Sequence, residues 1–241
     1  MLQLENVTVR FGGLTAVNDV TLSVGTGDVV GLVGANGAGK TTLFNAISGL
    51  VRPTTGRIVF NNTDVLRAPM YQRARMGIGR TFQIPQPMHE LTVRQNLEVA
   101  QRFGTGSIDK RRIDEILEFT NLTAKAQRDA STGLALTELK ALEVAKALST
   151  NPKLLLLDEV LAGLETSGKR NFMQMLKQLH QKFSVGIVII EHDIETISNL
   201  CARVAVLNFG GLIAEGTPAE VFSNPAVIKS YTGADTGAEH A

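Results

Sequence analysis

Eight residues, Gly34 to Thr41, combine residue types at a spacing that suits the binding of phosphate groups. They read Gly-Ala-Asn-Gly-Ala-Gly-Lys-Thr and match the pattern G-x-x-x-x-G-K-[ST]. Glycines let the backbone approach closely and turn its N–H groups toward phosphate oxygens. Lys40 supplies a mobile positive charge, and the hydroxyl of Thr41 is a ligand for Mg²⁺. The segment therefore predicts a loop that binds nucleotide phosphates together with Mg²⁺.

Two adjacent carboxylates, Asp158 and Glu159, follow the aliphatic run 154–157. Such a run is typical of a strand that is buried on both faces of a sheet. In open α/β sheets, ligands lie at the carboxyl ends of the strands. There Asp158 would hold Mg²⁺ through water, and Glu159 would orient and polarise an attacking water. The alternative is an ordinary solvated strand end, and the phosphate loop favours the catalytic interpretation.

One of the four histidines follows a second buried run, 187–190. An imidazole at that strand end, His192, is placed to hydrogen-bond a γ-phosphate, although its position alone favours an ordinary surface-loop histidine. His89, His180 and His240 have no comparable placement, and we expect them at the surface.

The N-terminal part of the chain predicts the elements that must position the loop. Apolar and polar residues alternate as in half-buried strands over residues 2–11, around 20–24 and over 57–60, and these predict an antiparallel sheet. The continuous apolar run Val29–Val33 predicts a buried strand that leads into the loop. A helix is expected to follow the loop, with Leu43, Ile47 and Leu50 on one face.

The remainder predicts helices that alternate with buried strands. Apolar residues recur at helical spacing in a helical insertion at about 84–150. Helices at 137–148 and 167–182, strands at 154–157 and 187–190, and a hairpin over 203–214 are also expected. Alternating strands and helices favour a mainly parallel sheet. The predicted fold is α/β: a phosphate-loop core with a mainly parallel sheet, an N-terminal antiparallel β subdomain and an inserted helical subdomain. We expect one domain over residues 1–233 and a flexible tail at 234–241.

The composition excludes several classes of protein. Lys and Arg number 24 and Asp and Glu 23, so a net charge of +1 gives no general attraction to nucleic acid or anionic lipid. The single cysteine, Cys201, cannot form an internal disulfide and is expected to be a small buried residue. No apolar run approaches the roughly 20 residues of a spanning helix. We therefore expect no direct insertion into lipid, and any link to a membrane would run through partner proteins.

The phosphate loop, helical insertion and acidic pair together resemble the nucleotide-binding subunits of ABC transporters, from about residue 2 to residue 233. The resemblance implies ATP and Mg²⁺ as ligands, with Phe11 stacking on adenine and Gln83 sensing Mg²⁺. It implies that Lys40, Gln83, Glu159 and His192 are catalytic and that Thr41, Gln83 and Asp158 hold Mg²⁺. The implied nucleotide-binding residues are Phe11, Val17, Gly34, Ala35, Asn36, Gly37, Ala38, Gly39, Lys40, Thr41 and Thr42.

Within that family several stretches resemble the branched-chain amino-acid importers. They are 11–14, 80–83, 190–193 and 214–218 with Asn224-Pro225. This implies an ATPase that powers import of branched-chain or related amino acids. Urea or amide importers and lipopolysaccharide-export ATPases share much of this pattern, and they remain alternatives.

The family signature, Leu-Ser-Gly-Gly-Gln at the start of a helix, is altered here to Leu-Ala-Leu-Thr-Glu at 134–138. Ala135 lacks the hydroxyl that would bond a partner's γ-phosphate, and Leu136 lacks glycine's close backbone approach. Glu138 adds negative charge, whereas Thr137 is expected to cap the helix. Because the family pairs head to tail around ATP, we expect a heterodimer in which this chain's phosphate loop meets a normal signature.

The resemblance also implies transmembrane permease subunits as partners, contacted around residues 83–96, and a peripheral place on the cytoplasmic face of the inner membrane. No nucleic-acid partner is expected. A soluble ABC ATPase acting on nucleic acid or ribosomes usually has a long coiled coil or two ATPase domains. A small-molecule kinase would need an acceptor pocket and an Arg-rich lid. We expect neither.

Overall fold

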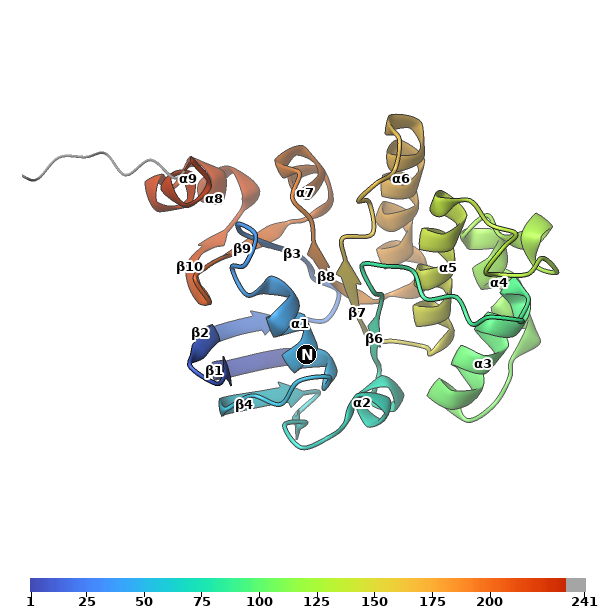
Figure 1. Ribbon diagram of the computed structural model, residues 1–241, viewed down its shortest axis with the longest axis horizontal. Coiled ribbons are helices and arrows are strands. Elements are labelled where there is room, and N and C mark those ends of the chain that lie inside the picture. Colours follow the sequence, from blue (N-terminus) through green and yellow to red (C-terminus); the bar gives the residue numbers. More distant parts are fainter. Residues whose placement is uncertain (233–241) are drawn as a thin grey trace, which may run out of the picture.

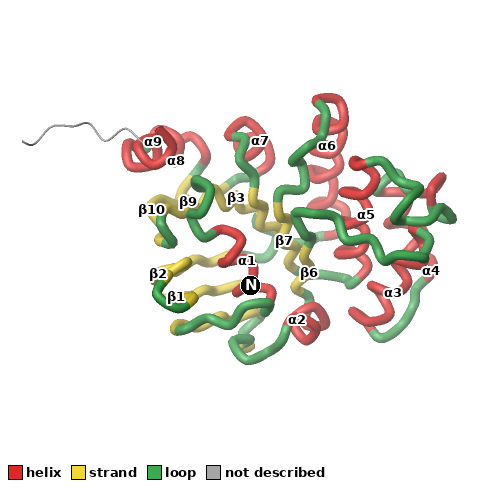
Figure 2. The backbone as a smooth tube through the Cα atoms, viewed as in Figure 1, coloured by secondary structure: helices red, strands yellow, loops and turns green. Residues whose placement is uncertain are grey.

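Two β-sheets organise the chain, and the computed structural model describes residues 1–232 of it (Figure 1). The predicted tail at 234–241 and His240 lie outside the described residues. Helix α1 (Lys40–Ser48) lies between the two sheets, as the red helix between yellow strands shows in Figure 2.

The first sheet is antiparallel and has the strand order β2–β1–β4–β5. Its strands are β1 (Leu2–Phe11), β2 (Leu14–Val24), β4 (Thr55–Phe60) and β5 (Thr63–Asp64). The alternation of residue types explains it, because Leu2, Leu4, Val20 and Leu22 are buried whereas their neighbours face outward. The predicted antiparallel sheet is confirmed.

The second sheet has the order β10–β9–β3–β8–β7–β6. It contains β3 (Val29–Val33), β6 (Ile78–Arg80), β7 (Leu154–Asp158), β8 (Gly186–Ile190), β9 (Arg203–Asn208) and β10 (Gly211–Gly216). All neighbouring pairs are parallel except β9 and β10, which form the predicted hairpin. The mainly parallel sheet is confirmed, and β6 is a strand that the sequence pattern did not predict. Its three residues are too few to show a periodicity.

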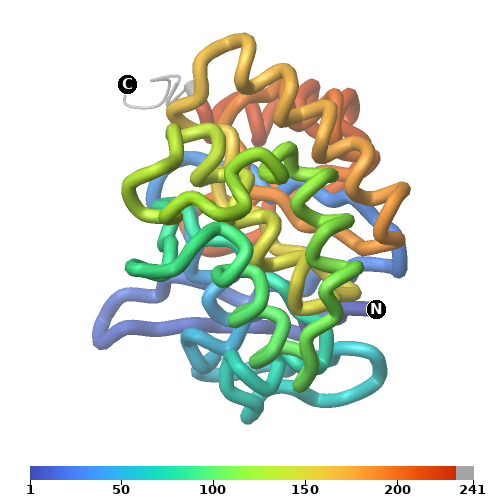
Figure 3. Tube along the Cα trace, turned by 90° about the vertical axis from the view of Figure 1, so that its right-hand side faces the viewer, coloured from blue at the N-terminus to red at the C-terminus, as the bar shows by residue number. Residues whose placement is uncertain are grey.

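Helices cover the second sheet and extend beyond one of its ends. The others after α1 are α2 (Met70–Met76), α3 (Val93–Thr105), α4 (Lys110–Phe119), α5 (Leu136–Ser149), α6 (Thr166–Phe183), α7 (Ile194–Leu200), α8 (Pro218–Ser223) and α9 (Pro225–Thr232), with a 3₁₀ turn at Thr123–Lys125. In Figure 1 α3, α4 and α5 lie together at the right, and Figure 3 turns this end to the front.

The first helix is shorter than predicted. It ends at Ser48 because Gly49, with φ of 83°, takes the left-handed conformation that stops a helix. Leu50 therefore lies outside α1 and is exposed, so the expectation that it shares the inward face with Leu43 and Ile47 is wrong.

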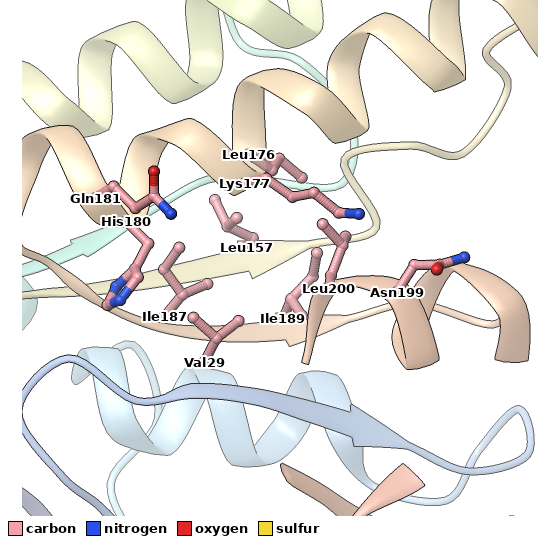
Figure 4. A pocket seen from close by; sticks show the side chains of 10 residues that line it. All are labelled: Val29, Leu157, Leu176, Lys177, His180, Gln181, Ile187, Ile189, Asn199 and Leu200. Carbon is pink, nitrogen blue, oxygen red and sulfur yellow. The ribbon is translucent and has the colours of Figure 1, made fainter. Parts of the chain in front are cut away.

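A cavity of about 310 Å³ lies between α6 and the sheet (Figure 4). Its floor is apolar, with Leu157, Ile187 and Ile189, and Lys177 lies at its rim. His180, expected at the surface, is half-buried there because its Nδ1 lies 3.0 Å from the carbonyl oxygen of Val185. His89 is exposed, as expected.

Candidate active site

The phosphate loop joins the end of β3 to the start of α1, as the sequence predicts. Glycine is required at both ends of this turn. A Cβ at Gly34, whose φ is 146°, would lie 2.1 Å from the carbonyl oxygen of Leu207. At Gly39, whose φ is 101°, it would lie 2.3 Å from that of Ala16. Side chains are therefore excluded where the backbone must wrap around a ligand.

Lys40 is held inside this loop. Its Nζ donates to the carbonyl oxygens of Gly34 at 2.7 Å and Ala35 at 2.9 Å. Burial lowers the pKa of Lys40, and the charges of Glu159 and Asp158 oppose that shift. The ammonium thus lies between the loop and the acidic pair, where phosphate oxygens would meet it.

A pocket of about 430 Å³ opens above the loop. It is lined by Asn36 to Thr42, by Phe11, Leu14, Thr15 and Ala16 from the β1–β2 turn, and by Glu159, Phe209 and Gly210. Phe11 and Ala16 line this pocket, whereas Val17, the next residue on β2, is fully buried. The roles of Phe11 and Val17 in nucleotide binding stay predictions.

Three predicted catalytic side chains meet at Glu159, just beyond β7. One carboxylate oxygen, Oε2, accepts from Nε2 of Gln83 at 2.6 Å. The other, Oε1, lies 2.6 Å from Nε2 of His192. Glu159 has φ of 47°, a conformation that costs free energy and clusters at functional sites. The parallel register of β6, β7 and β8 brings these residues to one edge of the sheet.

Asp158 is buried and only half-satisfied. Its Oδ2 pairs with the guanidinium of Arg80 at 3.2 Å, whereas Oδ1 has no hydrogen-bond partner. Burial raises the pKa of Asp158, and Arg80 opposes the rise. An orphaned buried oxygen of this kind fits a bound cation with its water shell. Gln83 uses its Nε2 toward Glu159, which leaves its amide oxygen as the atom that would face a cation. Oxygen donors of this kind fit Mg²⁺.

Two residues of the site escaped sequence reasoning. The guanidinium of Arg80 donates to Asn45 Oδ1 at 2.6 Å and to Ser48 Oγ at 2.9 Å, so it joins α1 to Asp158. Lys140 of α5 donates from Nζ to the carbonyl oxygens of Gln83 at 2.9 Å and Glu159 at 3.0 Å. A signal existed for Lys140, which stands four residues before the buried Val144 on the inward helix face.

Replacing Lys140 by methionine is expected to lower the turnover number for ATP about 10- to 100-fold, with little change in KM. Methionine keeps the length but loses the donors that fix the backbone of Gln83 and Glu159, and small misplacements of catalytic groups are costly. Steady-state ATPase assays of the assembled complex measure this. Lys110→Met, at the exposed start of α4, is the control. A rise in KM alone would contradict a positioning role.

The altered signature lies at the start of α5. The helix begins at Leu136, and the backbone N–H of Ala135 donates to the Glu138 carboxylate at 2.9 Å. Glu138 also pairs with Lys125 at 3.4 Å. Thr137 therefore lies inside the first turn, and the expectation that it caps the helix is wrong. This helix start already carries its own carboxylate.

Comparison with known proteins places these features in a family. A family model described as ABC transporter matches residues 17–162. The chain belongs to the ABC transporter family. A second model, the branched-chain amino acid ATP-binding cassette transporter, matches residues 212–236. As a family member the chain binds nucleotide and is an ATPase. ATP-binding subunits of ABC transporters dimerise and work with transmembrane permeases.

Relatives match along nearly the whole chain. The high-affinity branched-chain amino acid transport ATP-binding protein BraF of Pseudomonas aeruginosa is 36% identical, over 97% of this chain and 98% of its own. The lipopolysaccharide export system ATP-binding protein LptB of Acidithiobacillus ferridurans is 32% identical, over 97% of each.

A solved ATP-binding cassette of an ABC transporter, in its ADP conformation, superposes with a TM-score of 0.87 at 32% identity, over 97% of this chain and 99% of that one. The predicted fold class is thereby confirmed. Within residues 1–232 no helix combines the length and the apolar character required to cross a bilayer.

Proposed function

We propose that this chain is the ATP-hydrolysing subunit of an ABC importer for branched-chain amino acids. The observation that carries the hydrolytic part is the meeting of Gln83 and His192 on the two oxygens of Glu159, next to Lys40. This arrangement fixes a carboxylate at the mouth of a phosphate loop. The match of residues 212–236 and the whole-chain identity to BraF support the substrate class.

The site residues would divide the work of hydrolysis among them. Lys40 and the loop N–H groups would bind the β- and γ-phosphates and offset their charge. Glu159 would orient and polarise the attacking water, held by Gln83 and His192. Thr41, Gln83 and Asp158 would hold Mg²⁺, which supplies positive charge to the phosphates.

Reconstitution tests this function. The chain is combined in lipid vesicles with its permease and second ATPase subunits. We expect ATP hydrolysis that is coupled to uptake of leucine, isoleucine or valine. Hydrolysis coupled to urea uptake, or to lipopolysaccharide extraction, would contradict the substrate proposal but leave the ATPase site intact. Phosphate transfer to a metabolite would contradict the hydrolytic function itself.

The membrane partner would contact the segment between β6 and α3, at the cytoplasmic face of the membrane. Gln83 lies near the start of this segment, and Ile84 beside it is 71% exposed. An exposed aliphatic side chain next to a catalytic residue suits a contact that passes ATP-driven motion to a permease.

The second ATPase subunit would differ from this chain. The start of α5 carries leucine and threonine in place of the signature glycines, and the Glu138 carboxylate occupies the Ala135 N–H. A second chain's γ-phosphate would meet negative charge there instead of free donors. This chain's own phosphate loop needs an intact signature, which a different subunit would supply.

Lys40→Ala in this chain should therefore remove most ATP turnover of the assembled complex. The corresponding change in the partner subunit should remove less than half, because that loop faces the altered signature. Turnover of the two variant complexes, prepared identically and compared with the unaltered one, measures the difference. Equal losses would show two equivalent sites and would contradict the asymmetric arrangement.

A further inference from the structure

The tip of the β9–β10 hairpin carries an unusual residue. Phe209 is 89% exposed, the largest value among the exposed large apolar side chains of residues 1–232. Its φ of 45° lies in the left-handed region, where Asn, Asp and Gly are the ordinary choices in a two-residue hairpin. Both features cost free energy, and no packing within the described chain offsets either.

The tip is fastened in place at the mouth of the nucleotide pocket. The N–H of Gly210 donates to the carbonyl oxygen of Ala38 in the phosphate loop at 3.0 Å. The carbonyl oxygen of Gly210 accepts from the N–H of Asn18 on β2 at 2.8 Å. Phe209 is thus held by bonds to both walls of the pocket. A strained residue that its surroundings fix in this way points to a role in function.

Two further apolar side chains are exposed in the same 430 Å³ pocket. Phe11 is 50% exposed and Leu14 is 65% exposed, and both come from the β1–β2 turn. The pocket therefore carries exposed apolar groups from two hairpins beside one phosphate loop. A ligand that suits this surface has a flat apolar part joined to phosphates. A nucleotide base has that form, and every base has a face on which an aromatic ring can stack.

We propose that Phe209 is a second base-contacting residue, so that the purine of a bound nucleotide touches the β9–β10 tip as well as Phe11. The proposal rests on nucleotide binding at the phosphate loop and does not require hydrolysis or a particular transported substrate. Burial of the ring against a base would supply the free energy that its exposure and backbone conformation cost.

The test is equilibrium binding of ATP to the full chain in EDTA, which prevents hydrolysis, with inorganic tripolyphosphate as a second probe. Phe209→Asn removes the ring and suits the left-handed backbone. Its Kd for ATP should rise about tenfold or more, the loss expected for one stacked base. Its Kd for tripolyphosphate should stay within twofold of the parent value. The midpoint of thermal unfolding without nucleotide should be equal or higher, because the strain is relieved.

Phe209→Tyr keeps the ring and should bind ATP as the parent does. Phe103→Ala removes an exposed aromatic ring of α3 that does not line the pocket, and it should bind ATP unchanged. Three results would overturn the proposal. The Kd for ATP could stay within twofold of the parent in Phe209→Asn. Both ligands could weaken equally, which would mean that the tip shapes the phosphate loop. ATP-dependent pairing of subunits could be lost with ATP affinity unchanged, which would make Phe209 an interface residue.

Discussion

Replacing Glu159 by glutamine is expected to lower the rate of ATP hydrolysis about 1000-fold, while ATP still binds. Glutamine preserves the shape and keeps one oxygen that can accept from Gln83, but it removes the charge that polarises the attacking water. A positioned general base typically contributes between about 10² and 10⁴ in rate. The variant should retain bound ATP and accumulate as an ATP-dependent subunit pair, seen by size-exclusion chromatography with and without ATP.

A control substitution tests whether the loss of hydrolysis depends on the position of Glu159 or follows from removing any carboxylate charge. Glu138→Gln neutralises a carboxylate at the start of α5, on another part of the surface, and should leave turnover at this chain's own phosphate loop within about twofold. If Glu159→Gln retained more than a tenth of the parent activity, another group would have to orient the water. His192 would be the first to consider, because its Nε2 lies 2.6 Å from Glu159.

Replacing Arg80 by leucine is expected to lower the free energy of unfolding by about 3–5 kcal/mol, the usual cost of removing one partner of a buried ion pair. The guanidinium and the Asp158 carboxylate are 4% and 2% exposed, so neither is solvated. The change would leave Asp158 buried without a counter-charge, and it would also remove the donor to Asn45 and Ser48. Urea unfolding at pH 7 measures the loss.

The loss of unfolding free energy in Arg80→Leu should be smaller at low pH than at neutral pH. Burial already raises the pKa of Asp158, and loss of Arg80 removes the charge that opposes the rise. The folded pKa would then lie further above the unfolded one, so the folded variant binds a proton that the unfolded chain binds less readily. Stability gained in this way is present at low pH and is lost as pH rises through the folded pKa.

The difference in unfolding free energy between Arg80→Leu and the parent should therefore decrease as pH falls toward the ordinary pKa of an aspartyl carboxyl, about 4. Arg80→Leu combined with Asp158→Asn should recover part of the loss at pH 7, because no uncompensated charge remains. If the loss of unfolding free energy did not change with pH and was the same in the double variant, it would come from lost packing and not from the charge of Asp158.

The parts of the site that lie within short segments could be predicted from the sequence. The phosphate loop, the strand before it and the acidic pair each lie within about ten residues, so residue type and spacing suffice. The contacts of Arg80 and Lys140 were missed because their partners are remote, 78 positions away at Asp158 and 57 at Gln83. Only the folded chain brings them together.

The errors have physical causes of a similar kind. Gly49 ended α1 before Leu50, although the apolar spacing continued. At α5 the Glu138 carboxylate accepts from the Ala135 N–H, so the helix begins at Leu136 and Thr137 lies in its first turn instead of capping it.

Strand β3, which leads into the phosphate loop, is shared by two hydrophobic layers. Val30 and Leu32 pack in the layer that holds α1, whereas Val33 packs in the layer beneath α5 and α6. The intervening Gly31 leaves room for Ile197 and Cys201 of the α7 region. A nucleotide that restrains the phosphate loop also restrains β3, which packs in both layers. The free energy of binding is therefore distributed as added stability to both halves of the molecule, instead of remaining on the face where the ligand lies.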